Sequence, residues 1–132
     1  MTKDQITAHL RQEGWPLEAL GEATFRTRFR GEHRAFSFFL HVDATYMSLS
    51  VVPYVRLPAV PEVAERLMVR LLRLNRDINL ARFSVDDEGD VVLSVDYPLA
   101  DLDPSEVKDA LDVLSFYAEK HWEEVQALAA AV

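Results

Sequence analysis

Histidine, cysteine and carboxylate side chains supply most metal ligands and acid–base catalysts, and here they show no catalytic spacing. The four histidines, His9, His33, His41 and His121, do not form an HExxH pair, and cysteine is absent. A zinc site would therefore need ligands from distant elements. His121 falls on an apolar helix face, where we expect a packed side chain rather than a pH switch.

An acidic run, Asp86-Asp87-Glu88-Gly89-Asp90, has the composition of a calcium loop. It lacks that motif's ligand pattern and terminal glutamate, so we interpret it as a solvated hairpin tip. None of the four glycines forms a GxGxxG turn or a phosphate loop, and no GxSxG motif occurs. The sequence predicts no enzyme, no catalytic residue, no metal site and no cofactor.

Arginine beside aromatic residues is the pattern best suited to binding. In a predicted strand at 23–30, three arginines alternate with Phe25, Thr27 and Phe29, so one face of the strand is basic. The predicted partner-binding residues are Arg26, Arg28, Arg30, Arg34 and Phe39. A protein partner is the first interpretation. Single-stranded nucleic acid on this arginine and aromatic face is an alternative, and a small-ligand sensor is a second alternative that lacks converging polar groups.

Composition limits these classes further. The chain has 132 residues, 49% of them hydrophobic, which predicts a single domain over residues 1–132. Its net charge of −8 and the lack of an RNP-like motif make nucleic acid an unfavoured partner, and the charge disfavours anionic membranes. Neither a membrane-spanning apolar run nor a signal-peptide core is present, so we expect a cytoplasmic protein without a membrane contact.

Charge is unevenly distributed along the chain. Residues 26–82 hold ten arginines and five acids, whereas residues 83–132 hold two lysines and thirteen acids. The two stretches could attract each other within the fold or across a dimer, or they could form a polarised surface that steers a charged partner.

A helix and a hairpin over residues 61–98 organise the predicted fold. In the helix, one apolar row faces the protein's own sheet: Val63, Leu67, Leu71, Leu74 and Ile78. A second row, Ala64, Met68 and Leu72, widens the apolar arc beyond one sheet contact. We predict a homodimer through this second row unless the last helix covers it. The strands of the hairpin are 81–85 and 91–97.

The other elements follow from caps and periodicity. Thr2 and Gln5 form a capping box for a helix over 3–13, which Gly14 ends. Three antiparallel strands follow at 23–30, 35–42 and 45–52, with Pro53 breaking the last. Asp103-Pro104-Ser105-Glu106 starts one long final helix whose apolar seam reaches Leu128. Connecting residues Trp15, Leu17 and Leu20 are predicted to pack under a loop.

The order is helix, three strands, helix, two strands, helix, an α+β arrangement. The stretch LLRLNRDINLARFSVDDEGDVVLSVDYPL at 71–99, and DPSEVKDALDVL followed by Tyr117 and Trp122, resemble the YbjN family of bacterial proteins. That family's fold is similar to type III secretion chaperones. The resemblance implies an often dimeric, non-enzymatic domain that binds proteins, and it supplies no catalytic residues.

Overall fold

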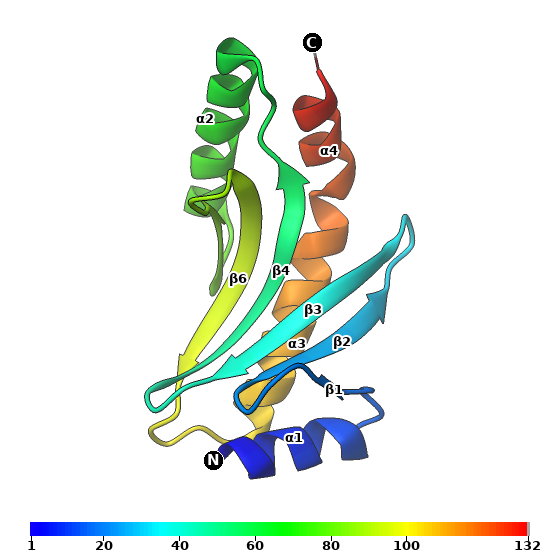
Figure 1. Cartoon of the computed structure of the whole chain (residues 1–132), viewed down its shortest axis with the longest axis vertical. Coiled ribbons are helices and arrows are strands. Elements are labelled where there is room, and N and C mark those ends of the chain that lie inside the picture. The colour runs from blue at the N-terminus through cyan, green and yellow to red at the C-terminus, as the bar shows by residue number, and fades with distance from the viewer. Residues whose placement is uncertain (132) are drawn as a thin grey trace.

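The computed structural model describes residues 1–131 as a six-stranded antiparallel sheet with helices against one face (Figure 1). The strand order is β1-β2-β3-β4-β6-β5. The strands are β1 (Glu18–Ala19), β2 (Thr24–Arg30), β3 (Ala35–Val42), β4 (Tyr46–Arg56), β5 (Ala81–Val85) and β6 (Asp90–Pro98). The helices are α1 (Lys3–Gln12), α2 (Pro61–Asp77), α3 (Pro104–Lys120) and α4 (Trp122–Ala130). The predicted α+β fold is confirmed.

A capping box forms at both predicted helix starts. Thr2 Oγ1 accepts a hydrogen bond from the Gln5 amide, and the Thr2 amide donates to Gln5 Oε1. Asp103 and Glu106 make the same exchange at the start of α3, where Pro104 occupies the first turn. Gly14 has a φ of 95°, a left-handed conformation that glycine adopts without steric cost. These local signals were sufficient to place both helix starts.

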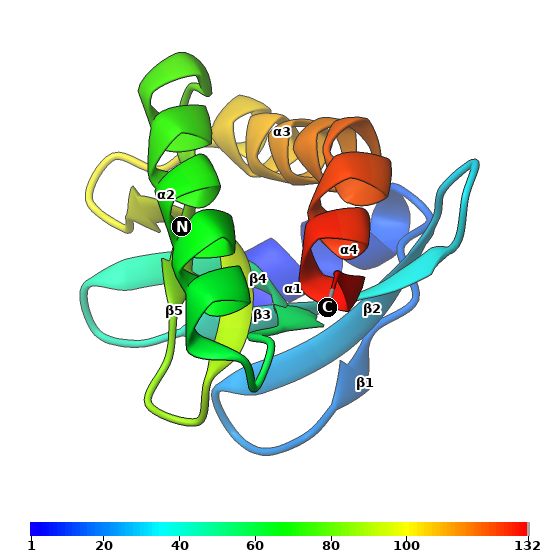
Figure 2. The same ribbon diagram turned by 90° about the horizontal axis from the view of Figure 1, so that it is seen from above.

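Apolar residues on the inner sheet face and on the helices form one core. Figure 2 shows α2, α3 and α4 on the same side of the sheet. The inward rows of β2 and β3 face the core as predicted, with Phe29 partly buried and the others buried. Strand β6 contributes Val91, Leu93 and Val95 at 0% exposure. The predicted inward row of α2, from Val63 to Ile78, is buried as well. Because β6 pairs on both sides, it is the central strand of this half of the sheet.

Strand β4 differs from its prediction. It continues through Pro53 to Arg56 instead of ending there, and its register with β6 shifts between Val51 and Val55. A proline lacks the amide hydrogen that regular pairing needs, and an irregular stretch of the ladder removes that requirement. The two-residue strand β1 was not predicted. Leu20, expected to pack, is 48% exposed, whereas Trp15 and Leu17 lie partly buried against the core.

The final helix is two helices, not one. His121 separates α3 from α4 with φ −101° and ψ 1°, outside helical geometry. The apolar spacing continues across this break, since His121 and Val125 are both buried. The apolar periodicity of the sequence therefore gave no sign of the break at His121. No helix among residues 1–131 is both long enough and apolar enough to span a membrane.

Candidate functional site

The predicted arginine row lies on the outer face of the sheet, away from the helices. Antiparallel pairing sets Arg26 opposite Phe39 and Arg28 opposite Ser37, so β2 and β3 bring the basic row and the aromatic ring together. Arg30 lies opposite Ala35 at the end of the hairpin. Arg28 and Arg30 are exposed, and Phe39 is partly exposed.

One arginine of this row is neutralised within the chain. Arg26 Nη2 lies 2.5 Å from Glu18 Oε2, and its Nε donates to the same oxygen at 3.1 Å. The carboxylate comes from β1, which explains why the sequence pattern gave no sign of this pair. Among residues 1–131, neither Arg28 nor Arg30 has a carboxylate oxygen within ion-pair distance. These two arginines are therefore the cations of the row that remain available.

Arg34 lies apart from that row, in the turn before β3. Its guanidinium carbon is 4.6 Å from the Trp122 ring centroid and 5.3 Å from that of Phe36. Its Nε donates to the Ala35 carbonyl oxygen at 3.1 Å. Within the described chain Arg34 also lacks an ion-pair partner. The structure thus sets Arg34 on aromatic rings, apart from the arginine row of β2.

A cavity of about 450 Å³ lies between β3 and β4. Pairing between these strands extends only from Phe39–Ser50 to Val42–Met47. Beyond Phe39 they diverge, as Figure 1 shows. The cavity lining comes from both strands, the preceding turn and α4: Arg34, Phe36, Ser37, Phe39, Val51, Val52, Pro53, Tyr54, Val55 and Trp122. We name this feature the β3–β4 wedge.

Aromatic rings form the inner side of the β3–β4 wedge. Trp122 meets Phe36 edge-on at 5.7 Å and Tyr54 edge-on at 5.5 Å between ring centroids. Burial raises the pKa of the Tyr54 hydroxyl far above its usual range, and the negative charge of Glu119 adds to this shift. Tyr54 is therefore a neutral hydrogen-bond donor here. Sequence reasoning did not select Tyr54 or Trp122, because they are 68 residues apart in the chain.

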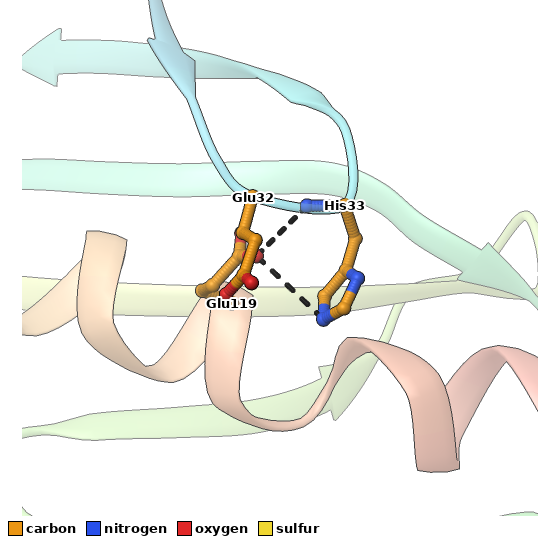
Figure 3. Close-up of side chains that lie close together, drawn as sticks. All are labelled: Glu32, His33 and Glu119. Atoms are coloured by element: carbon orange, nitrogen blue, oxygen red, sulfur yellow. Dashed lines mark hydrogen bonds and ion pairs between the residues drawn. The ribbon is translucent and has the colours of Figure 1, made fainter.

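Glu32, His33 and Glu119 converge at the turn between β2 and β3 (Figure 3). Each offers one metal-ligand atom, and these atoms lie within 4.8 Å of one another. Glu119 Oε1 accepts the His33 backbone amide at 2.9 Å, and His33 Nε2 lies 3.3 Å from Glu123 Oε1. These contacts fasten the turn to α3 through Glu119 and to α4 through Glu123. We interpret the cluster as a structural clamp.

The acidic hairpin tip is also held by its own backbone. Asp86 Oδ1 accepts the amides of Glu88 and Asp90 at 3.0 and 2.9 Å. One carboxylate oxygen each of Asp86, Glu88 and Asp90 lies within 4.8 Å of the others, so these side chains are closer than the sequence pattern suggested. Arg56 Nε lies 3.8 Å from Asp90 Oδ1 and partly balances the charge. The geometry is that of an Asx turn.

The second apolar row of α2 is divided by burial. Ala64 is 9% exposed, whereas Met68 is 37% and Leu72 69% exposed. Helix α4 packs against α2, as the competing prediction allowed, and Arg70 Nε bonds Glu124 Oε2 at 2.7 Å across the two helices. Ala64 therefore does not belong to an exposed contact surface. Met68, Leu72 and Val85 remain around a shallow cavity of about 150 Å³ between α2 and β5.

Comparison with known proteins assigns the family. The model of the YbjN family, whose description reads "Putative bacterial sensory transduction regulator", matches residues 2–127. The chain belongs to the YbjN family. The resemblance predicted from residues 71–99 and the late helix is thus confirmed. Curated proteins gave no match.

This YbjN-family chain also resembles a solved structure. The similar chain is part of "the heterodimeric complex ExoU-SpcU from the type III secretion system (T3SS) of Pseudomonas aeruginosa". The TM-score is 0.63 with 18% identity, covering 93% of this chain and 96% of the other. At this identity the similarity establishes a shared fold, consistent with the predicted type III secretion chaperone-like architecture.

Ion pairs across the YbjN-family fold use part of the charge asymmetry. Arg56–Asp90, Arg70–Glu124 and Arg82–Asp96 join the basic stretch to the acidic one. Mutual attraction within the chain therefore accounts for these arginines. It does not account for Arg28, Arg30 and Arg34, which have no such pair among residues 1–131.

Proposed function

We propose that this protein is a non-enzymatic binding module that acts as a chaperone or adaptor for a cytoplasmic protein partner. The observation that carries the proposal is the outer face of β2 and β3. Arg28 and Arg30 project there without an internal carboxylate, and Phe39 lies on the same face. That the fold neighbour was solved as a heterodimeric complex is consistent with a protein partner.

The charge distribution suggests which partner surface would fit. The protein as a whole carries a net charge of −8, so a strongly anionic partner is repelled except where local arginines face it. Arg28 and Arg30 would steer a local acidic patch to the outer face, and Phe39 would add an apolar contact at its centre. The partner surface is therefore acidic around an apolar residue.

Charge reversal tests this surface. Affinity capture from native cytoplasm, read by mass spectrometry, would compare the natural chain with Arg28→Glu/Arg30→Glu. The control, Arg11→Glu/Arg76→Glu, makes the same change in net charge on α1 and α2. We expect the first variant to lose a partner that the control retains. Equal recovery by both folded variants, or no partner for the natural chain, would contradict the proposal.

Single-stranded nucleic acid is the alternative for the same face, since arginines beside Phe39 resemble a base-stacking surface. A mobility shift with a single-stranded oligonucleotide distinguishes the two classes. Binding that weakens steeply with salt would favour nucleic acid. No shift at low salt would remove this alternative.

We also propose that the protein forms a homodimer through Met68, Leu72 and Val85. Leu72 is the most exposed large apolar residue of α2, and the cavity beside it continues the apolar surface onto β5. Light scattering after gel filtration measures the oligomeric state. Leu72→Glu should release folded monomer, because burying an unpaired carboxylate at the dimer contact is strongly unfavourable. Leu20→Glu, at an exposed leucine far from α2, should stay dimeric; a natural monomer contradicts the proposal.

A further inference from the structure

The β3–β4 wedge exposes strand edges inside the sheet. Ala35–Phe38 pair with β2 on one side, but their pairing with β4 has already ended at Phe39. Val51 and Val55 pair with β6, again leaving the side toward β3 without a strand. Two strand segments therefore face each other across the wedge, each with one unpartnered side.

The ladder geometry identifies a main-chain group that faces the wedge. The Val42 amide donates to the Ala23 carbonyl, toward β2. In an antiparallel ladder, successive residues direct their amide and carbonyl groups to opposite sides. Ser37, five residues earlier, must therefore direct its amide and carbonyl toward β4, where no strand meets them. An added strand could pair with these groups.

The side chains around that edge favour particular chemistry. Phe36, Tyr54 and Trp122 form an apolar inner wall, and Arg34 lies on two of these rings. A guanidinium fixed on aromatic rings keeps its outer N–H groups for a carboxylate. The volume of about 450 Å³ is in the range of pockets that enclose small ligands, which is enough for side chains entering from a strand.

We propose that the β3–β4 wedge binds an extended acidic peptide segment of the partner protein. The segment adds to β3 beside Ser37, sends a carboxylate to Arg34, and places an apolar side chain two residues away against Trp122. This rests on the proposed protein-binding function and identifies the kind of segment bound. Arg28 and Arg30 would then contact the folded surface of the partner, and the β3–β4 wedge would bind its extended segment.

A peptide probe tests the wedge without knowledge of the partner. The probe is a fluorescently labelled nonapeptide in which glutamate and valine take turns at the odd positions, so that both lie on one strand face, with threonine at the even positions. In its charge-inverted control, lysine replaces each glutamate. Anisotropy titration with the full chain should give binding of the glutamate peptide only. Arg34→Gln should weaken it by about tenfold or more, as expected for loss of a charge-assisted hydrogen bond. Arg11→Gln is the matched control.

Hydrogen exchange then locates the bound peptide. The Ser37 amide should exchange more slowly in the complex, whereas amides of β5 should not change. Equal binding of both peptides, no binding of either, unchanged affinity in folded Arg34→Gln, or protection only outside the wedge would each overturn the proposal. The arginine-face proposal fails separately, through Arg28→Glu/Arg30→Glu, so the two results are distinguishable.

Discussion

Tyr54 Oη donates a 2.6 Å hydrogen bond to the backbone carbonyl oxygen of Ala118, and the bond is fully buried. It joins β4 to the last turn of α3. Carbonyl groups in a helix's last turn have no partner within the helix, so a side chain must satisfy them when water cannot. Because α3 ends at Lys120, the buried carbonyl of Ala118 lies in the last turn, and the Tyr54 hydroxyl donates the hydrogen bond that it needs.

Tyr54→Phe should destabilise the fold without changing its shape. The ring packing stays, but the Ala118 carbonyl loses its donor, which costs about 1 to 3 kcal/mol. Urea unfolding followed by circular dichroism measures the loss. Tyr46→Phe is the control, since Tyr46 is 46% exposed and should unfold as the natural chain does. Equal midpoints for the two variants would contradict the role of this bond.

His121 should make stability depend on pH. Burial, followed by the charge of Lys120, lowers the pKa of its imidazole, with Arg70 acting the same way and Glu124 opposing. Below about pH 6.5 the unfolded chain therefore binds a proton that the folded chain does not. The free energy of unfolding should have its full value above that pH. It should decrease as the pH falls toward the lowered pKa of His121 in the folded chain.

Substitution at His121 isolates this effect. His121 stacks on Tyr117 at 5.9 Å and meets Phe83 edge-on at 6.1 Å, so His121→Phe keeps the aromatic packing. Urea unfolding between pH 5 and 7 should show a smaller pH dependence in this variant. His9→Phe should keep the natural dependence. An unchanged slope in His121→Phe would assign the dependence to other groups.

Gly31 and Glu119 should be energetically coupled. A Cβ at Gly31 would collide with Glu119 Oε2, the carboxylate that also accepts the His33 amide. Gly31→Ala should therefore cost more stability in the natural chain than in a Glu119→Ala background. A double-mutant cycle should give a coupling of about 1 kcal/mol. Additive effects of the two substitutions would show that the turn and α3 do not constrain each other.

Asn75 should stabilise the attachment of β5 to α2. Its Oδ1 accepts the Phe83 amide at 2.7 Å, and its Nδ2 donates to the Phe83 carbonyl at 2.9 Å. The side chain thereby completes the pairing of an edge strand. Asn75→Ala should cost about 1 to 3 kcal/mol in thermal or urea unfolding, because both groups lose a partly buried partner. Asn79→Ala, at an exposed position, should cost little.

Local chemistry determined how much of the fold was predictable. The Thr2 and Asp103 caps and the alternation around Phe36 and Leu40 depend on near neighbours, and they gave correct elements and faces. The predicted end of β4 at Pro53 was wrong because the effect of a proline depends on whether the strand pairing is regular at that point. The break at His121 was missed because apolar spacing persists through it.

The candidate surfaces were less predictable, for a different physical reason. Outward placement of Arg28 and Arg30 follows from strand alternation. The neutralisation of Arg26 by Glu18, the burial of Ala64 and the position of Arg34 on Trp122 depend on tertiary packing. No spacing in the sequence encodes the point at which β3 and β4 stop pairing, so the wedge between them could not be foreseen.

The position of β6 between β4 and β5 has a consequence for the order of synthesis. Tyr46 pairs with Pro98 and Val55 with Val91, although α2 and β5 intervene in the chain. In a nascent chain that has reached residue 80, β4 still lacks its partner strand β6. The arginines synthesised by then also lack the later acidic residues with which some of them form ion pairs. Completion of the sheet must wait for residues 90–98, and such distant pairing slows folding relative to local contacts. Until then, the growing polypeptide exposes the apolar inner face that the last fifty residues will cover.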